Sequence, residues 1–428
     1  MTVESVKTAF EKGEIKAYKL EEALFAELKD WESACRKAAE IRAEFIEKKL
    51  KVKISGIRSA YISTSDSKKM TSGIEQKIGG AIIPMGFAGP AKIDGEYAKG
   101  EFYIPAATNE AALIAGMNRG IACLNRAGGV KTKITRDCMT RAPVIEFASE
   151  KEAGEAVKEI KEKGKIYGEM KKAAEEGATV SKMLDIQVFE SGRHVWLRHV
   201  FFTGDSMGMN SVTKYTAASV KKFLELIGGK GIGAKLIALS GNMCVDKKAN
   251  LINIQLGRGK TVELKASVPA AVLKEIYGIA PAAVEKVNLI KNVEGSKLAG
   301  TNIGGYNSNA ANAVAALFAA TGQDLAQVVE SSSCMVECKD AGKALEFSIT
   351  LFCLEVGTIG GGMGFGTARE ALEMLGCAGP GKKPGENAKK LAEIIAAAVA
   401  AQEINLICTL AREFELADSH ISLARGKK

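Results

Sequence analysis

The stretch from Pro143 to Ser240 constrains the fold most, because strand-like and helix-like patterns follow one another there in a fixed order. Short apolar runs predict four strands, and charged stretches with helical periodicity predict the helices between them. In chain order these elements are residues 144–147, 150–176, 183–189, 194–202, 211–227 and 235–239. The order β-α-β-β-α-β is that of a ferredoxin-like unit of about 100 residues. We therefore predict an inserted domain, which the chain enters near Arg141 and leaves near Ser240.

The rest of the chain predicts an α+β architecture with a large helical and β domain. Apolar residues recur at three- and four-residue steps over residues 18–50, which predicts amphipathic helices in a small N-terminal piece. At about 150 residues per domain, the 428 residues have room for two or three cores. The predicted boundaries are 1–66 for the helical N-terminal domain, 67–141 and 240–428 for the two parts of the large domain, and 142–239 for the insertion.

Further elements of the large domain follow from the same patterns. A buried helix is predicted over 106–127, with Asn109 and Glu110 in its first turn. Two closing helices are predicted after Pro384, followed by a polar tail that contains His420. The other predicted strands are 251–255, 261–266 and 344–354, and the other predicted helices are 270–277, 309–320 and 368–375.

Charge and hydropathy exclude several classes of protein. The net charge of +9 is spread along the chain, so a nucleic-acid partner is not expected, and small anionic ligands are favoured instead. No run approaches the roughly 18 consecutive apolar residues that a membrane span needs. The first residues lack the apolar core of a secretory signal. We therefore expect a cytoplasmic protein without a membrane partner.

The cysteines and histidines do not indicate a metal site. The nine cysteines lack a CxxC pair and are expected to be reduced, mostly buried thiols. Cys334 and Cys338 could share one helical face, but no histidine lies near them. His194 and His199 are five apart on a predicted strand and face opposite sides. His420 is either a solvated tail residue or, if the tail folds over a cleft, a proton donor near neutral pH.

Two glycine-containing loops are candidates for binding a cofactor. Residues 357–366 hold six glycines between a strand and a helix, which suits either a phosphate at a helix N-terminus or a flexible connection. Residues 205–210, DSMGMN, lie between a strand and a helix. Asp205 there is either a helix N-cap or part of an apolar floor with polar edges for a nicotinamide ring.

A third loop, residues 240–248, lies where the chain re-enters the large domain. Lys247 and Lys248 beside Asp246 could bind a carboxylate and neutralise an oxyanion, although adjacent lysines are more often an exposed basic pair. Cys244 in the same loop has no histidine nearby in sequence, so a buried thiol is the default interpretation.

Taken together and in this order, the motifs resemble 3-hydroxy-3-methylglutaryl-CoA reductase of the class found in eukaryotes and many archaea. Any one motif is weak, whereas six in register along nearly the whole chain are specific. The motifs are PAATNE with NRG (105–110, 118–120), RDCMTRAP (136–143), GDSMGMN (204–210), SGNMCVDKK (240–248), GQD (322–324) and GTIGGG (357–362).

The resemblance implies reduction of 3-hydroxy-3-methylglutaryl-CoA to mevalonate and CoA, for isoprenoid precursors, with two reduced nicotinamide cofactors. It implies four catalytic residues with distinct roles. Lys247 would stabilise the thioester oxygen as charge develops. Glu110, kept protonated by burial, would give a proton to the aldehyde oxygen. Asp324 would bridge these two residues, and His420, on a mobile tail, would protonate the departing CoA thiolate.

The resemblance also implies the binding residues. Contacts with the carboxylate and hydroxyl of the substrate are implied for Arg141, Ser240, Asp246, Lys248, Lys291 and Asn312. Contacts with the nicotinamide and pyrophosphate are implied for Asp205, Met207, Gly208, Met209, Asn210, Gly360, Gly361 and Gly362. The inserted domain would thus be the cofactor domain. Residues 178–182 lack the arginine that NADPH-using members place there, and Lys182 with Ser181 could replace it. NADPH is the first choice, and NADH stays an alternative.

The resemblance further implies a homodimer or homotetramer with each site built across a subunit interface. Two other functions stay open from the sequence. One is the reverse reaction, mevalonate oxidation. The other is a catalytically silent protein that binds a CoA thioester, against which the complete set of catalytic residues argues.

Overall fold

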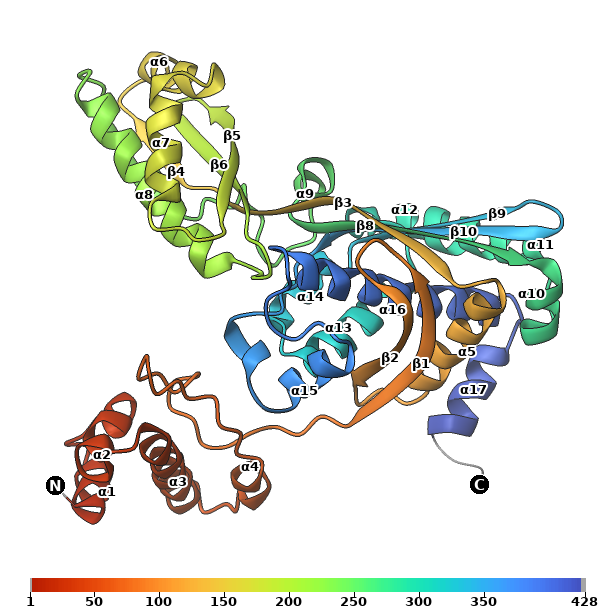
Figure 1. Ribbon diagram of the computed structural model, residues 1–428, viewed down its shortest axis with the longest axis horizontal. Coiled ribbons are helices and arrows are strands. Elements are labelled where there is room, and N and C mark those ends of the chain that lie inside the picture. The colour runs from red at the N-terminus through yellow and green to blue at the C-terminus, as the bar shows by residue number, and fades with distance from the viewer. Residues whose placement is uncertain (1, 425–428) are drawn as a thin grey trace.

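The computed structural model describes residues 2–424, apart from the side chains of residues 419, 420 and 422–424. Figure 1 shows three groups of elements: a set of N-terminal helices, a lobe that contains α6, α7 and α8, and a larger body around α16. The buried apolar side chains form three separate clusters that follow the same division. The chain is therefore of mixed α and β structure, as predicted, with a large antiparallel sheet.

The N-terminal helices are α1 (Val3–Glu11), α2 (Leu20–Leu28), α3 (Trp31–Leu50) and α4 (Ser55–Ser59). The sequence limits α3 at both ends. Asp30 caps its N-terminus by accepting the N–H of Ser33, and Lys51 ends it in the left-handed conformation. The buried Arg42 of α3 pairs with Glu21 of α2, which joins the two helices. The amphipathic helices predicted over 18–50 are confirmed.

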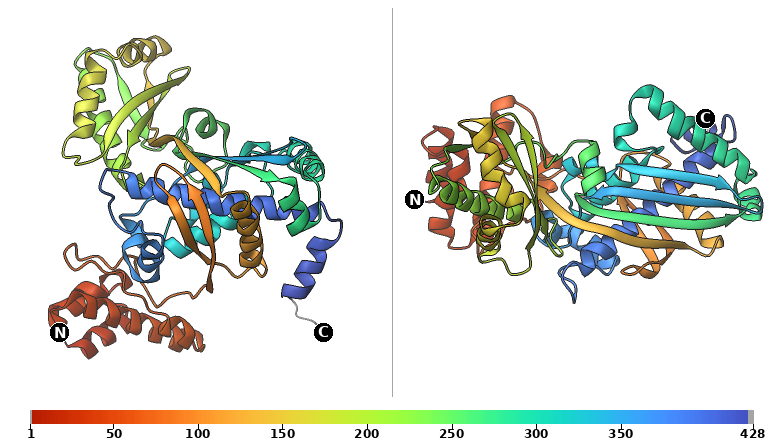
Figure 2. Two further views of the ribbon diagram at one scale, coloured as in Figure 1. Left: turned by 45° about the vertical axis from the view of Figure 1, so that its right-hand side comes forward. Right: turned by 90° about the horizontal axis from the view of Figure 1, so that it is seen from above.

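The large body is built on antiparallel strands that pair in the order β3-β8-β10-β9. The strands are β1 (Met85–Asp94), β2 (Lys99–Ala107), β3 (Val130–Arg141), β8 (Gly259–Pro269), β9 (Cys334–Asp340) and β10 (Ala344–Leu354). Seen from above in Figure 2, β3, β8, β10 and β9 lie side by side. Strand β3 also leaves this body, because its last residues, Met139–Arg141, pair with β6 of the other lobe.

Helix α16 (Glu386–Leu410) is the centre of the large body. It packs against β3, β8 and β10 and against α5 (Leu113–Arg126) and α13 (Ala310–Thr321). Within the described residues it is the one helix long and apolar enough to cross a membrane, but 89% of its most apolar window is buried inside the structure. This burial identifies α16 as a core helix.

The other lobe contains β4 (Val144–Phe147), α6 (Glu150–Lys161), α7 (Lys165–Glu175), β5 (Lys182–Ser191), β6 (His194–Phe202), α8 (Met209–Gly228) and β7 (Ala234–Ala238). All neighbouring strands of the lobe run antiparallel, in the order β7-β4-β6-β5. His199 on β6 is fully buried and contacts Ser219 of α8, whereas His194 lies near Glu146 and is partly exposed. The two histidines therefore face different sides, as predicted.

Short helices complete the fold. They are α9 (Leu251–Leu256), α10 (Ala270–Tyr277), α11 (Pro281–Val287), α12 (Ser296–Ala299), α14 (Val328–Ser331), α15 (Gly366–Met374) and α17 (Glu415–Ala424). A π-helical stretch covers Asn288–Gly295, and 3₁₀ turns cover Ala17–Lys19, Asn302–Gly304, Leu325–Gln327 and Gly361–Gly364.

Four details of the sequence-based prediction are wrong. Residues 251–255 form helix α9 and not a strand, because Asn250 caps them by accepting the N–H of Asn253. Cys334 and Cys338 lie on strand β9, where residues four apart also share a face, and both are buried. Glu110 precedes α5, since β2 continues to Ala107 and Ala112 adopts a positive φ before the helix. His420 lies within α17 and not beyond the last helix.

The contact between α5 and α16 depends on Gly120. A Cβ atom built on this residue would lie 1.9 Å from the carbonyl oxygen of Ala401. We expect Gly120→Ala to lower the free energy of unfolding by about 1–3 kcal/mol, because the two helices must separate. Gly154 on α6 is a matched control with no atom within 4 Å of its Cβ position. Gly154→Ala should stabilise by about 0.5–1 kcal/mol. Urea unfolding of both variants beside the unchanged chain checks this, and a Gly120→Ala protein of undiminished stability would contradict it.

Candidate active site

A cavity of about 720 Å³ lies between the two lobes. Four loops surround it: the one before α8, the glycine-rich loop after β10, the loop after β7 and the loop after α13. The lining residues are Arg141, Ser206–Ser211, Asp246, Lys247, Gly322, Gln323, Asp324 and Ile359–Met363. Most of these residues belong to the motifs that the sequence analysis singled out separately, and the fold brings them together.

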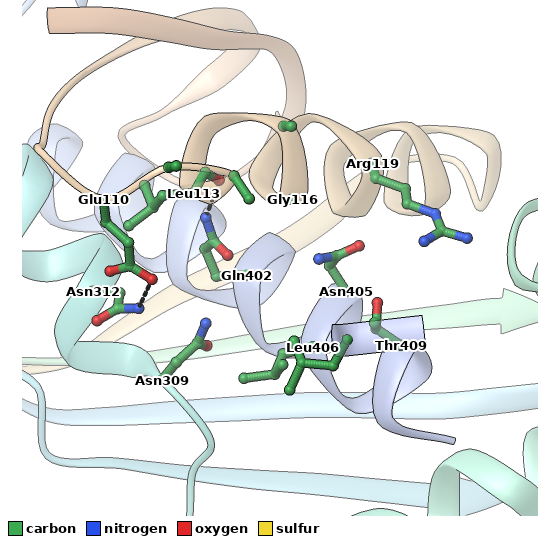
Figure 3. Close-up of a pocket in the computed structure, with 14 residues that line it drawn as sticks. Glu110, Leu113, Gly116, Arg119, Asn309, Asn312, Gln402, Asn405, Leu406 and Thr409 are labelled. Atoms are coloured by element: carbon green, nitrogen blue, oxygen red, sulfur yellow. Dashed lines mark hydrogen bonds between the residues drawn. The ribbon is translucent and has the colours of Figure 1, made fainter. Parts of the chain in front are cut away.

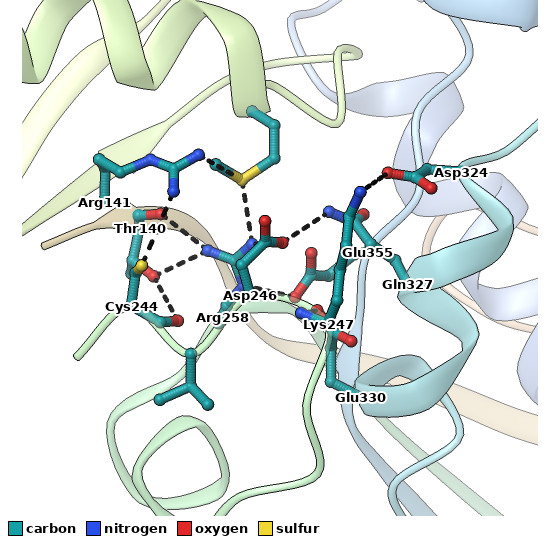
Figure 4. A network of polar contacts seen from close by, with 12 residues as sticks. Thr140, Arg141, Cys244, Asp246, Lys247, Arg258, Asp324, Gln327, Glu330 and Glu355 are labelled. Atoms are coloured by element: carbon teal, nitrogen blue, oxygen red, sulfur yellow. Dashed lines mark hydrogen bonds and ion pairs between the residues drawn. The ribbon is translucent and has the colours of Figure 1, made fainter. Parts of the chain in front are cut away.

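Lys247 and Asp324 form an ion pair in this cavity, with 3.0 Å between Nζ and Oδ2 (Figure 4). Asp324 follows the C-terminus of α13, which Gly322 ends with a φ of 68°, and its carboxylate also accepts the N–H of Ala326. The hydrogen bond from the ammonium to Asp324 raises the pKa of Lys247 above its ordinary value. Lys247 is therefore a fixed cation, about half exposed to the cavity.

The loop that carries Lys247 has an unusual backbone. Asn242, Val245 and Lys247 adopt positive φ angles of 66°, 44° and 60°. Such angles are costly for residues other than glycine, above all for the β-branched Val245. The loop keeps this shape because side chains bind its backbone. Trp196 and Arg198 of β6 donate to the carbonyl oxygens of residues 241 and 243, and Glu330 of α14 accepts the N–H of Lys247 at 2.7 Å.

Other predicted substrate contacts lie at the same loop. Arg141, the last residue of β3, donates to Ser240 Oγ at 2.8 Å and to Thr213 of α8 at 3.0 Å. Lys248 is exposed, and its ammonium contacts the backbone carbonyl of Asp246 at 3.1 Å. Cys244 is buried between these groups, as expected for a thiol without a histidine partner.

Behind this loop lies Arg258, which sequence reasoning missed. Its guanidinium has no exposed surface and contacts Asp246 at 2.7 Å, Glu355 at 2.6 Å and the carbonyl of Thr140 at 2.7 Å (Figure 4). Glu330 lies beside Asp246 and Glu355. One oxygen each of Asp246, Glu330 and Glu355 lie within 4.8 Å of one another, as metal ligands would. The one sequence signal for this cluster was Glu355 alone between the apolar residues Leu354 and Val356.

The two glycine-containing loops meet at the cavity. Ser206 and Ile359 form a parallel bridge, and Gly357 packs against the backbone of residues 205–207. Gly360 and Gly361 have φ angles of 83° and 53°, and space around the Cβ position of Gly360 is open. Backbone groups of this turn can therefore approach a ligand closely. Met209 closes the floor, with its sulfur 3.0 Å from Arg258.

Asp205 is engaged elsewhere. It does not cap α8, whose N-cap is Gly208. Its buried carboxylate instead accepts the N–H groups of Gly381, Gly385 and Ala388, at and before the start of α16. Asp205 thus joins the loop before α8 to the central helix of the large body. Lys182, exposed, lies opposite Phe202 at the end of the sheet from which this loop begins.

Glu110 lines a different cavity, of about 290 Å³, between α5, α13, α16 and α17 (Figure 3). Its carboxylate accepts a hydrogen bond from Asn312 at 3.1 Å. Asn309 and Arg119 line the same cavity, and Arg119 pairs with Glu415 of α17 at 2.6 Å.

Within one chain Glu110 is exposed and does not line the cavity of Lys247 and Asp324. The side chain of His420 lies outside the described residues.

Lys291, a predicted substrate contact, lies on the π-helical stretch Asn288–Gly295. Its ammonium contacts Asn292 at 3.1 Å, and Asn292 in turn accepts a hydrogen bond from Ser308. Glu403 of α16 accepts the N–H groups of Ser308 and Asn309, which fixes the start of α13. Lys291 and Asn312 therefore come from elements that meet on the same side of α16.

Comparison with known proteins shows the family to which the chain belongs. A family model described as hydroxymethylglutaryl-coenzyme A reductase matches residues 38–425. The chain belongs to the hydroxymethylglutaryl-coenzyme A reductase family. The 3-hydroxy-3-methylglutaryl-coenzyme A reductase of Pyrococcus abyssi is 42% identical and covers 99% of this chain and 100% of that relative. A reductase of the same description from Dictyostelium discoideum is 37% identical and covers 99% of this chain and 74% of that relative.

A solved structure agrees in fold. The class II 3-hydroxy-3-methylglutaryl-CoA reductase from Streptococcus pneumoniae, bound to NADPH, has a TM-score of 0.61 at 15% identity, covering 86% of this chain and 96% of that one. The predicted family is thus confirmed, and the hydroxymethylglutaryl-coenzyme A reductase family is one of oxidoreductases.

The contact between Asp205 and α16 can be tested directly. Asp205→Asn turns one acceptor oxygen into a donor facing backbone N–H groups. We expect the opening free energy of residues 381–388 to fall by about 1.5–3 kcal/mol, the range for a lost hydrogen bond to a charged group. Hydrogen–deuterium exchange of these amides measures this change. Asp30→Asn is the control, since asparagine and aspartate cap helices about equally well. Unchanged exchange at residues 381–388 would show that Asp205 does not hold the turn.

Proposed function

We propose that this chain reduces 3-hydroxy-3-methylglutaryl-CoA to mevalonate and CoA by two successive hydride transfers. The observation that carries the proposal is the Lys247–Asp324 ion pair, which lies in a cavity lined by both glycine-containing loops. A fixed cation beside a site for a hydride donor is what reduction of a thioester carbonyl requires. Membership of the family supplies the substrate class.

Lys247 stabilises the oxygen of the thioester carbonyl in this proposal. Negative charge develops on that oxygen when hydride reaches the carbon, and a preorganised ammonium lowers the energy of this charge without reorganisation. Asp324 holds the ammonium in place and keeps it protonated. The strained loop serves the same end, since it sets the direction of the Lys247 side chain.

The residues around the cavity fit a nicotinamide cofactor, which supplies the hydride when bound. The open space at Gly360 leaves the backbone of the turn free to approach a pyrophosphate, and Met207, Gly208, Met209 and Asn210 line the facing wall. Asp205 supports this wall through α16 and not through a direct contact. Lys182 lies opposite Phe202, at the end of the sheet from which the loop before α8 begins, which supports a contact with a 2′-phosphate and our choice of NADPH over NADH.

The strand order β7-β4-β6-β5 supports a ferredoxin-like cofactor domain over residues 142–239. The three apolar clusters support three cores. We retain the boundaries 1–66 for the N-terminal helices and 67–141 with 240–428 for the large domain. The cytoplasmic location stays a prediction.

Glu110 and His420 supply the protons in this proposal. Glu110 protonates the aldehyde oxygen, with Asn312 orienting its carboxylate, and His420 protonates the CoA thiolate. Glu110 is exposed in the single chain, whereas a carboxyl acid needs burial to keep its proton near neutral pH. A second chain that covers Glu110 and brings another chain's Lys247 to it meets this requirement. We therefore retain the homodimer or homotetramer with sites across the interface.

The first test is turnover by purified protein. With 3-hydroxy-3-methylglutaryl-CoA, we expect two reduced cofactors oxidised for each CoA released, and faster oxidation of NADPH than of NADH. Absorbance of the reduced cofactor and a thiol assay for CoA measure the two quantities. Lys182→Ala should remove the preference for NADPH. Substrate binding without turnover would support the silent binding protein, and turnover only of mevalonate would support the oxidative direction.

Two variants separate the roles within this assay. Lys247→Ala should abolish reduction of both the thioester and mevaldehyde. His420→Gln should impair thioester reduction while mevaldehyde reduction continues, because only the first requires protonation of a thiolate. Normal turnover by Lys247→Ala, or equal loss of both reductions in His420→Gln, would contradict the assigned roles.

A mixed dimer tests the shared site. Glu110→Gln and Lys247→Ala chains, each with its own affinity tag, are co-expressed, and dimers carrying both tags are purified. If each site takes Glu110 from one chain and Lys247 from the other, one of two sites is intact and about half of the unmutated activity returns. Mixed dimers as inactive as the two parents would place both residues in one chain's site.

A further inference from the structure

Two buried glutamates behind the Lys247 loop are not explained by the roles above. Glu330 lies on α14 and Glu355 follows β10, and their exposed fractions are 0% and 1%. Each uses one oxygen: Glu330 Oε1 accepts the N–H of Lys247 at 2.7 Å, and Glu355 Oε1 pairs with Nε of Arg258 at 2.6 Å. The second oxygens, Glu330 Oε2 and Glu355 Oε2, are buried and have no hydrogen-bond donor among the described residues.

The charge of this cluster does not balance if every carboxyl group is ionised. Asp246, Glu330 and Glu355 would place three negative charges within 4.8 Å of one another, and the buried Arg258 pairs with two of them, Asp246 and Glu355. Like charges this close, away from water, are strongly unfavourable. If the two glutamates share one proton, the cluster carries one negative charge fewer. One of the two unpaired oxygens then carries the proton and donates it, and the other accepts the hydrogen bond.

The same cluster controls the position of Lys247. Glu330 accepts the backbone N–H of Lys247, whose φ is 60°. Arg258 pairs with Asp246, the preceding residue in the chain. Positive φ angles at non-glycine residues cost of order 1–3 kcal/mol each and persist only where the surroundings impose them. The Glu330 contact is therefore one of the interactions that hold the strained loop, and through it the ammonium on Asp324.

We propose that Glu330 and Glu355 share one proton and act as positioning residues, holding Lys247 in the geometry that its oxyanion role requires. The inference rests on the role of Lys247 proposed above. It adds a buried acid–carboxylate pair that touches neither substrate nor cofactor but sets where the cation stands.

The electrostatics of the surroundings agree with a shared proton. Burial raises the pKa of Glu355 well above its ordinary value, and burial also raises the pKa of Glu330. The charged and titratable groups that face the pair are Arg258, Asp246, Lys247 and, on β10, Cys353. A raised carboxyl pKa contributes stability that is present at low pH and is lost as pH rises through the folded-state value. Activity should therefore fall on the alkaline side as the pair loses its proton and Lys247 shifts.

A divalent cation bound by the three carboxylates is the competing interpretation. Two of the three carboxylates already give an oxygen to Arg258, whose charge would repel a cation. A shared proton can be accommodated without moving Arg258, so the geometry favours a proton over a cation. The experiment below separates the two, since glutamine replaces a protonated carboxyl group but not a metal-bound carboxylate.

The test compares alanine and glutamine variants. Glu330→Ala and Glu355→Ala should lower kcat about tenfold or more, the cost of an unpaired buried group. Glu330→Gln and Glu355→Gln should restore kcat near neutral pH and abolish the alkaline fall, because an amide donates its N–H at every pH. KM should change little in all four. Glu337→Gln, an exposed position on β9, is the control and should keep the unchanged pH profile.

Infrared spectroscopy gives a readout that does not depend on turnover. The unchanged protein should show a buried carboxylic-acid band that shifts in D2O and is absent from both glutamine variants but present in Glu337→Gln. This measurement stands even if the proposed reaction fails, which keeps the two hypotheses distinguishable. The inference is overturned if glutamine fails to restore what alanine removes, if the alkaline fall persists, if no such band exists, or if the protein binds one divalent ion that both glutamine variants lose.

Discussion

The site depends on the burial of one cation, Arg258. A guanidinium without exposed surface is stable only if its donors are met by acceptors. Here the acceptors come from β3, from the Lys247 loop and from the end of β10. These three segments are far apart in sequence, and each leads into the cavity between the lobes. Pairing one buried charge therefore fixes the relative positions of Arg141, Asp246 and the glycine-rich loop, and the chemistry of the cavity follows from that arrangement.

The two lobes are joined by contacts of different kinds around this cation. Strand β3 passes through both, pairing with β8 over most of its length and with β6 at its end. Asp205 binds the start of α16, and Ser206 pairs with Ile359. Each contact lies within a few residues of a motif at the cavity. The backbone strain of the Lys247 loop is sustained because side chains from both lobes bind it, so the loop cannot relax unless the lobes separate.

Much of this fold could be predicted from local pattern, and the failures have physical reasons. The strand 344–354 and the helix 270–277 match β10 and α10 because their periodicity and their end signals agree. The prediction of a strand over residues 251–255 is wrong, because the side chain of Asn250 caps a helix there. The motifs identified the loops that line the cavity, but they did not identify the residues that these loops contact. Nothing local shows that Asp205 meets residue 388, or that Glu355 meets Arg258, since these pairs arise from the tertiary fold alone.

The division of the site residues between two cavities separates two tasks of the proposed reaction. Stabilising an oxyanion requires a cation that does not move, and Lys247 is set in a strained loop fixed by buried charges. Delivering a proton to a leaving thiolate and then releasing CoA requires a group that can move. His420 lies on α17, which packs against α16 and is joined to α5 by the ion pair of Glu415 with Arg119, at the cavity of Glu110. The described residues that line this cavity and those that line the Lys247 cavity do not overlap, so a shift of α17 need not displace the Lys247 loop. Rigid charge stabilisation and mobile proton delivery are thus compatible in one fold.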